Sequence, residues 1–184
     1  GISTAARLAM RTDLAPPAQI AFATGRVIHD ARTAGLLKRL AHRHIDYASD
    51  HYRDPQGELS LRQAVSAQLA ASRGVRCHPG QIFITSGTQQ ALDFAIRVLV
   101  SPGETVMIED PCYPPARLAF LLNGAAISGL PVDGEGLITE KLSLYDGQPP
   151  AAIYVTPSHQ YPSGSALPLA RRLELLAFAQ ARGS

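Results

Sequence analysis

The sequence has few of the residues on which several classes of protein depend. Its 184 residues include only two cysteines, Cys77 and Cys112, which stand in no CxxC or CxxH spacing. Structural zinc sites need such spacing and a disulfide framework needs more cysteines, so we expect no metal site, no disulfide and reduced thiols. No stretch reaches the length of about eighteen apolar residues that indicates a membrane span. We therefore expect a soluble, cytoplasmic protein with no membrane partner.

Charge of one sign is also scarce. With 17 Lys and Arg residues against 15 Asp and Glu, the net charge is only +2, without the clustered positive charge of a nucleic-acid-binding domain. The signatures of nucleotide-binding proteins and hydrolases are missing: GxxxxGK followed by Ser or Thr, GxGxxG, and GxSxG. These absences disfavour a hydrolase or a nucleotide-binding domain.

What the chain does contain is an alternation of short apolar runs and amphipathic stretches, with an apolar fraction of 46% that suits one folded domain. The pattern predicts strands at 81–85, 105–109, 126–132 and 151–156. It predicts helices at 33–44, 59–72, 89–100, 115–123 and 167–182, with Gly74 placed to end the second. Strands that alternate with helices are parallel and covered on both faces, so we expect an α/β fold.

Ligands of such sheets bind beyond the carboxyl ends of the strands. Three of these ends carry polar and aromatic residues: "TSGTQQ", "EDPCYPP" and "TPSHQYPSG". The first joins a strand to a helix through Gly87, Thr88 and Gln89. Because the first turn of a helix has unpaired N–H groups and a partial positive charge, it can hold a phosphate. The alternative is that Ser86 or Thr88 merely caps the helix.

The other two ends offer an aromatic ring and further polar groups. Tyr113 follows a rigid Asp-Pro turn and could stack on a flat ligand, although an ordinary tyrosine is the simpler interpretation. His159, Gln160 and Tyr161 supply hydrogen-bond donors and acceptors within three residues. A lone histidine in a loop is usually solvated, so His159 alone carries little weight.

Four motifs in register resemble the fold-type I, pyridoxal-phosphate-dependent aminotransferases of class I and II. They are "HYRDPQGELSLRQAVSAQLAASRGV", "SGTQQALD", "PGETVMIEDPCYPP" and "TPSHQYPSG". The resemblance covers roughly residues 45–184. It implies the three-layer αβα large domain of that family, with a mainly parallel sheet, in truncated form. Residues 1–44 would then be an N-terminal arm or linker with one helix, and 45–184 a partial large domain.

Two longer stretches resemble one branch more closely. "SRGVRCHPGQIFITSGTQQALD" and "YVTPSHQYPSG" look like the MocR type of GntR-family transcriptional regulators, whose aminotransferase-like domain follows a winged helix-turn-helix. Ordinary aminotransferases usually carry Asn-Pro-Thr-Gly where this chain has Tyr-Pro-Ser-Gly at 161–164. This departure favours the regulator, whose effector would be an amino acid or amine. The alternative is a fragment of a genuine aminotransferase, which transfers an amino group between an amino acid and a 2-oxo acid.

The resemblance gives the first two strand ends roles in binding pyridoxal phosphate. Gly87, Thr88 and Gln89 would hold the phosphate of the cofactor, which agrees with the helix-terminus argument. Tyr113 would stack on its pyridine ring.

The resemblance also assigns residues that the spacing alone does not. Tyr52 matches a family tyrosine that reaches across a homodimer to the partner's cofactor phosphate. Tyr161 stands in place of an asparagine that binds the ring oxygen, so that contact is open here. His159 and Gln160 are neighbouring candidates.

The family's chemistry needs a lysine that forms a Schiff base with the cofactor and an aspartate beside the ring nitrogen. The chain has only two lysines, Lys38 and Lys141, and neither follows a late strand. We expect the missing groups beyond Ser184, so we assign no catalytic residue and predict that this chain alone is inactive. DNA binding would require a helix-turn-helix domain that is not visible before residue 45.

Overall fold

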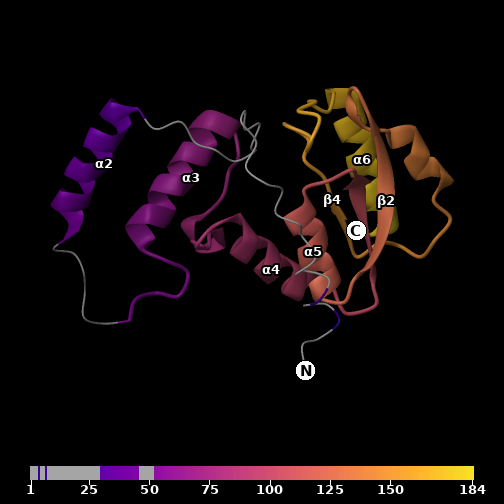
Figure 1. Cartoon of the computed structure of the whole chain (residues 1–184), viewed down its shortest axis with the longest axis horizontal. Coiled ribbons are helices and arrows are strands. Elements are labelled where there is room, and N and C mark those ends of the chain that lie inside the picture. The colour runs from indigo at the N-terminus through magenta and orange to yellow at the C-terminus, as the bar shows by residue number, and fades with distance from the viewer. Residues whose placement is uncertain (1–3, 5–6, 8–29, 46–51) are drawn as a thin grey trace. The chain divides into compact units, whose positions relative to one another are not determined.

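The computed structural model describes residues 4, 7, 30–45 and 52–184. From residue 30 onward, the chain divides into two compact units, one that ends at Ile84 and one that begins at Thr85. The unit that ends at Ile84 contains helices α2 (Ala31–His44) and α3 (Leu59–Arg73) and the 3-10 turn η2 (Pro79–Gln81) (Figure 1). No described helix has the length and apolar character needed to cross a membrane.

The two helices of this unit confirm the predictions for 33–44 and 59–72. Asp30 caps α2, because its carboxylate accepts a hydrogen bond of 2.8 Å from the Thr33 N–H. Gly74 ends α3 in the left-handed conformation, with φ of 66°, and its N–H donates to the Ala70 carbonyl. Local sequence signals therefore mark the start of α2 and the end of α3.

The predicted strand at 81–85 is wrong. Gln81 completes η2, and the residues after it form no strand, although Ile82 has an extended backbone with φ of −107° and ψ of 128°. An extended segment becomes a strand only when a neighbour pairs with its backbone. In the described part of the chain the backbone N–H of Ile84 donates to Gln56, and none of the four strands pairs with this segment.

The unit that begins at Thr85 holds the sheet. Its elements are α4 (Thr88–Leu99), β1 (Thr105–Asp110), α5 (Pro114–Leu122), β2 (Ala126–Asp133), β3 (Gly136–Leu137), η3 (Thr139–Leu144), β4 (Ala152–Tyr154) and α6 (Leu169–Arg182). The predicted helices and strands from residue 89 onward are confirmed, with ends displaced by one or two residues.

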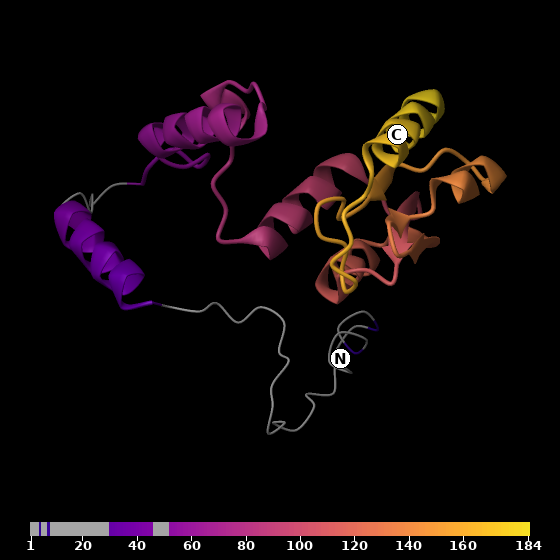
Figure 2. The same cartoon turned by 90° about the horizontal axis from the view of Figure 1, so that it is seen from above.

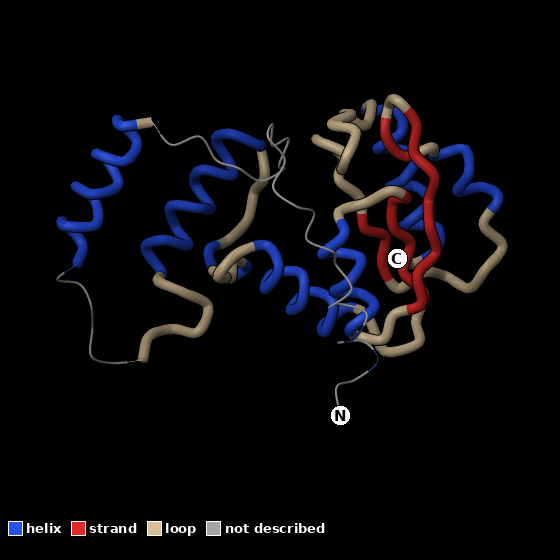
Figure 3. The backbone as a smooth tube through the Cα atoms, in the orientation of Figure 1, coloured by secondary structure: helices blue, strands red, loops and turns tan. Residues whose placement is uncertain are grey.

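The described strands form one sheet in the order β3-β2-β1-β4 (Figure 3). β1 lies parallel to both β2 and β4, which confirms the expected mainly parallel sheet. The short β3 turns back antiparallel on β2, with Val132 opposite Leu137. Pattern analysis does not find β3 because two residues are too few for any periodicity.

Alternation along β1 creates three layers. Val106 and Ile108 pack with Ile96 of α4 and Phe120 of α5 in one apolar cluster. Met107, between them, points to the other face and packs in a second cluster with residues of β2, β3, η3 and α6. Figure 2 shows α5 and α6 on opposite sides of the strands. The expected three-layer αβα arrangement is confirmed.

Candidate functional site

The segment before α4, which the sequence predicted to be the end of a first strand, forms an open helix terminus instead. Gly87 is the residue before α4 and has φ of 126°, a conformation that favours glycine. No described side chain caps α4, so the capping role considered for Ser86 and Thr88 is not what these residues do. A Cβ at Gly87 would meet no atom within 4 Å. The first turn of α4 is exposed at the positive end of the helix dipole, and the Gln90 Oε1 accepts a 2.6 Å hydrogen bond from the Ser86 N–H just before it.

Gln89 connects this terminus to the second strand end. It lies on the first turn of α4 with Thr88, and both residues are exposed. The Nε2 of Gln89 donates a 3.2 Å hydrogen bond to the carbonyl of Pro115, in the first turn of α5. The starts of α4 and α5 therefore lie together at the same edge of the sheet.

Two tyrosines bring the second and third strand ends together. Tyr113 is the residue before α5, and Tyr161 lies in the loop that follows β4. Their ring centres are 5.6 Å apart and their planes make an angle of 72°, which is the favourable edge-to-face geometry. Both side chains are half-buried, so each keeps an exposed part for a ligand.

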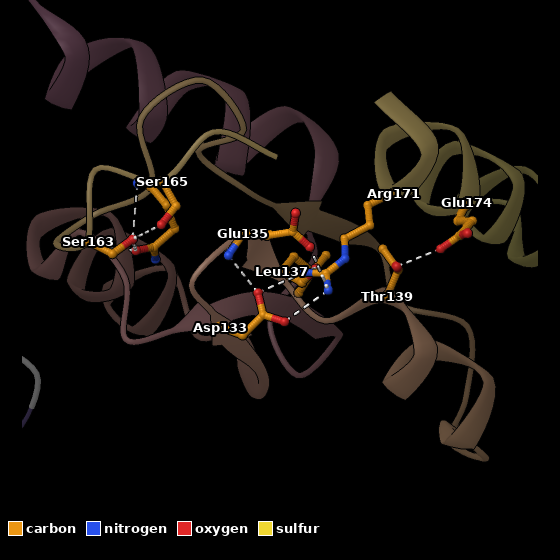
Figure 4. Close-up of polar contacts among 9 residues, drawn as sticks. Asp133, Glu135, Leu137, Thr139, Ser163, Ser165, Arg171 and Glu174 are labelled. Carbon is orange, nitrogen blue, oxygen red and sulfur yellow. Dashed lines mark hydrogen bonds and ion pairs between the residues drawn. The ribbon is translucent and has the colours of Figure 1, made fainter. Parts of the chain in front are cut away.

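The side chain of Gln160 holds this loop together through hydrogen bonds. The residue is only 2% exposed, and its Nε2 donates to the carbonyls of Pro111 at 2.8 Å and Tyr161 at 2.6 Å. Its Oε1 accepts from the backbone N–H and the hydroxyl of Ser163, whose hydroxyl also contacts Ser165 (Figure 4). Both amide hydrogens are used, so Gln160 ties the third strand end to the second. His159 beside it is exposed.

Arg172 closes the base of the same loop, a role that sequence patterns do not reveal. Its Nε donates to the carbonyl of Leu167 at 2.8 Å and its Nη2 to that of Pro157 at 2.7 Å. The N–H of Leu167 also donates to the Pro157 carbonyl at 2.8 Å. The loop between residues 157 and 167 is therefore closed at its ends and filled by Gln160 at its centre.

A nearby ion-pair cluster holds the β2–β3 hairpin on α6. Arg171 donates to both carboxylate oxygens of Asp133, at 2.8 and 2.9 Å, and lies 3.6 Å from Glu135 (Figure 4). The hydrogen bond from Arg171 lowers the pKa of Asp133 to about 2. Among the described residues no three His, Cys, Asp or Glu side chains gather as they would around a metal ion.

Tyr52 belongs to the other compact unit, where its side chain is fully exposed. The segment after it is held by Arg62, which is 5% exposed and donates to Asp54 at 2.5 Å and to the Gly57 carbonyl at 2.9 Å. The role of Tyr52 in cofactor binding remains a prediction.

Comparison with known proteins places this geometry in a family. The family described as Aminotransferase class I and II matches residues 17–184. The probable rhizopine catabolism regulatory protein MocR of Rhizobium meliloti is 36% identical over 87% of the chain, which spans 32% of that relative. The 2-aminoadipate transaminase of Thermus thermophilus is 35% identical over 72% of the chain, which spans 32% of the enzyme.

A solved structure agrees with the fold. An archaeal alanine:glyoxylate aminotransferase superposes with a TM-score of 0.73 and 32% identity, over 80% of this chain and 38% of the enzyme. The chain thus spans about a third of the length of the curated relatives reported above.

Proposed function

The chain belongs to the class I and II aminotransferase family, and on that premise we propose that it is the pyridoxal-phosphate-binding effector domain of a GntR-family regulator of the MocR type. The observation that carries the regulatory part is the likeness to a regulatory protein across 87% of the chain. The Tyr-Pro-Ser-Gly turn at 161–164 supports it. In the full-length protein, which we propose is a cytoplasmic homodimer, DNA binding would belong to another domain.

The open terminus of α4 fits the phosphate of the cofactor. A phosphate brings negative charge, and the uncapped first turn offers backbone N–H groups and the positive end of the helix dipole. Gly87 leaves the approach open, and the exposed side chains of Thr88 and Gln89 add donors. We assign the phosphate to these three residues.

The two tyrosines fit the flat ring. Tyr113 would stack on it, and the edge-to-face contact with Tyr161 would hold Tyr113 in its orientation. The phenol of Tyr161 and the imidazole of His159 remain candidates for the polar groups of the ring. Because both amide hydrogens of Gln160 are used in bonds to the carbonyls of Pro111 and Tyr161, we propose that this residue holds Tyr161 in place.

When bound, pyridoxal phosphate supplies an aldehyde that combines with amines and a ring that withdraws electrons. The described residues supply binding and orientation. Lys38 lies in α2 and Lys141 in η3, so neither belongs to the segments "TSGTQQ", "EDPCYPP" and "TPSHQYPSG". The contribution we propose for this chain is therefore non-covalent, and the ligand of the full-length protein would be an amino acid or amine.

A second function, that of a genuine aminotransferase, is favoured by the likeness to the 2-aminoadipate transaminase. The two functions are separated by two assays on the full-length protein loaded with pyridoxal phosphate. One assay measures its affinity for its own upstream DNA across a panel of amino acids and amines. The other measures amino transfer to 2-oxo acids with the same panel.

The regulatory function predicts that at least one amine changes the DNA affinity and that none is turned over at a catalytic rate. Turnover of an amino acid and a 2-oxo acid, without sequence-specific DNA binding, would establish the aminotransferase instead.

A further inference from the structure

A buried carboxylate stands at the carboxyl end of β1. Glu109 is 1% exposed, and its Oε2 accepts two hydrogen bonds from Thr156, from the backbone N–H at 3.0 Å and from the hydroxyl at 2.6 Å. Its Oε1 is the one buried side-chain nitrogen or oxygen in the described part of the chain that lacks a partner. A buried carboxylate with only one of its oxygens hydrogen-bonded is costly to the folded state. Packing alone therefore does not account for Glu109.

The hydroxyl of Thr156 extends this contact into the loop of the third strand end. The backbone N–H of Tyr161 donates a 3.3 Å hydrogen bond to the Thr156 Oγ1. A threonine hydroxyl has a single proton, and here the hydroxyl of Thr156 donates it in the hydrogen bond to Glu109. The lone pairs of Oγ1 are then left to accept from Tyr161. Glu109 thus sets the direction of the hydroxyl, and the hydroxyl sets the position of the Tyr161 backbone.

We propose that Glu109 is a positioning residue that fixes Tyr161 through Thr156, and thereby holds the Tyr113–Tyr161 pair ready for the flat ring of a cofactor. The chain of contacts runs from the middle strand of the sheet to the edge-to-face ring pair, whose centres are 5.6 Å apart. The link to the cofactor rests on the proposed function, whereas the link from Glu109 to Tyr161 does not.

The same unit contains a second threonine–glutamate contact, between Thr139 and the exposed Glu174. The hydroxyl of Thr139 donates to the Glu174 Oε2 at 2.6 Å, the same kind of contact at the same distance (Figure 4). Glu174 lies on α6 and contacts neither tyrosine of the site through this bond. Glu174→Gln is therefore the control for any general effect of altering a threonine–glutamate contact.

The test compares Glu109→Gln, Glu109→Met, Thr156→Val and Glu174→Gln in the full-length protein. Glutamine keeps an oxygen that can accept from Thr156, whereas methionine keeps the length of the side chain and loses the acceptor. The first readout is hydrogen exchange of the Tyr161 amide without cofactor, and the second is the dissociation constant of pyridoxal phosphate. The free energy of unfolding of each variant shows whether the fold is retained.

We expect Glu109→Met and Thr156→Val each to speed exchange at Tyr161 about tenfold, the loss of one hydrogen bond, and to weaken cofactor binding by a similar factor. Glu109→Gln should restore slow exchange, and Glu174→Gln should change neither readout. The double variant of Glu109→Met and Thr156→Val should bind the cofactor no worse than the weaker single variant, because both act through one contact.

Unchanged exchange at Tyr161 in a folded Glu109→Met variant would overturn the inference. So would equal losses in the Gln and Met variants, because charge rather than the contact with Thr156 would then be acting. If Glu109→Met does not fold while Glu174→Gln does, the carboxylate serves the fold itself and the inference also fails. If the parent protein does not bind pyridoxal phosphate, the proposed function fails, and exchange at Tyr161 still decides the role of Glu109.

Discussion

The two cysteines differ in what surrounds their sulfur atoms. Cys112 is 8% exposed in the apolar cluster between β1 and α5, and burial raises the pKa of its thiol, an effect that the positive charge of Arg117 partly offsets. Cys77 is only half-buried, next to Ser66 of α3. Since the thiolate is the reactive form, the burial of Cys112 makes its thiol less reactive than that of Cys77.

We therefore predict that Cys112 reacts at least about tenfold more slowly than Cys77 with a small alkylating reagent at pH 8. Mass spectrometry of the two peptides over time measures both rates in one sample. In denaturant the rates should converge. Equal rates in the folded protein would show that Cys112 is not shielded as the structure indicates.

A buried arginine gives a second prediction at this scale. Arg62 donates to a carboxylate and to the carbonyls of Gly57 and Pro79, so it holds the turn before α3 to η2. Arg62→Ala removes all of these hydrogen bonds, while the Pro79 carbonyl keeps the one from the Ile82 N–H, and should cost about 3 kcal/mol of the free energy of unfolding.

Denaturant titration of the full-length protein measures this cost, with Arg73→Ala, on the exposed last turn of α3, as the control. Arg62→Lys should recover only part of the loss, because an ammonium group cannot reach several acceptors in the planar pattern of a guanidinium. Full recovery by lysine would mean that charge alone matters.

Among the helices and strands, the sequence predicts those that depend on nearby residues. It does not predict whether a segment pairs with a strand that is distant in sequence. The periodicity of 89–100 and the left-handed Gly74 are local, and both are confirmed. The segment 81–85 has the composition of a strand and is not one, because no described strand pairs with it. The periodicity of apolar residues is enough to predict a helix, whereas a strand also depends on pairing with residues distant in sequence.

The candidate site divides in the same way. Sequence motifs identify Gly87, at the start of α4, and Tyr113 and Tyr161, which follow β1 and β4. They do not identify Glu109 or Arg172, which act through contacts with loops distant in sequence. Alternation along β1 could have identified Glu109, because it places this residue on the same buried face as Met107.

The β2–β3 hairpin gives a prediction at the element scale. Because the pKa of Asp133 in the folded protein is about 2, below the usual 3.8, its ionised form stabilises the protein above pH 3.8. This contribution is lost as the pH falls from about 4 to about 2. Asp133→Asn should therefore lower stability at pH 7 and have little effect near pH 2.

Thermal unfolding of the parent and variant across this pH range measures the difference. Asp146→Asn, at an exposed position, is the control. A destabilisation by Asp133→Asn that is constant from pH 7 to pH 2 would contradict the role of the Arg171 contact.

At the scale of the whole molecule, the described sheet leaves apolar surface open. β4 pairs with β1 alone among the described strands, so its other edge is free. On α4, Phe94, Val98 and Leu99 are 49%, 82% and 64% exposed. A free strand edge beside exposed apolar side chains promotes association.

We predict that the 184-residue chain, prepared by itself, self-associates at micromolar concentration and that Val98→Lys reduces this association. Sedimentation velocity measures both, and Val75→Lys, in the other unit, is the control. If the chain is monodisperse and melts cooperatively, the exposed apolar surface does not drive association and the prediction is wrong.

The start of α4 is the site that we propose for the phosphate of pyridoxal phosphate. The most direct test is the dissociation constant of this cofactor for the full-length protein, for Thr88→Ala and for Gln180→Ala, a control on the exposed surface of α6. Loss of one hydrogen bond to a charged group should weaken binding by Thr88→Ala about tenfold and leave Gln180→Ala unchanged. Equal affinity of all three proteins, or no binding by the parent, would contradict the account.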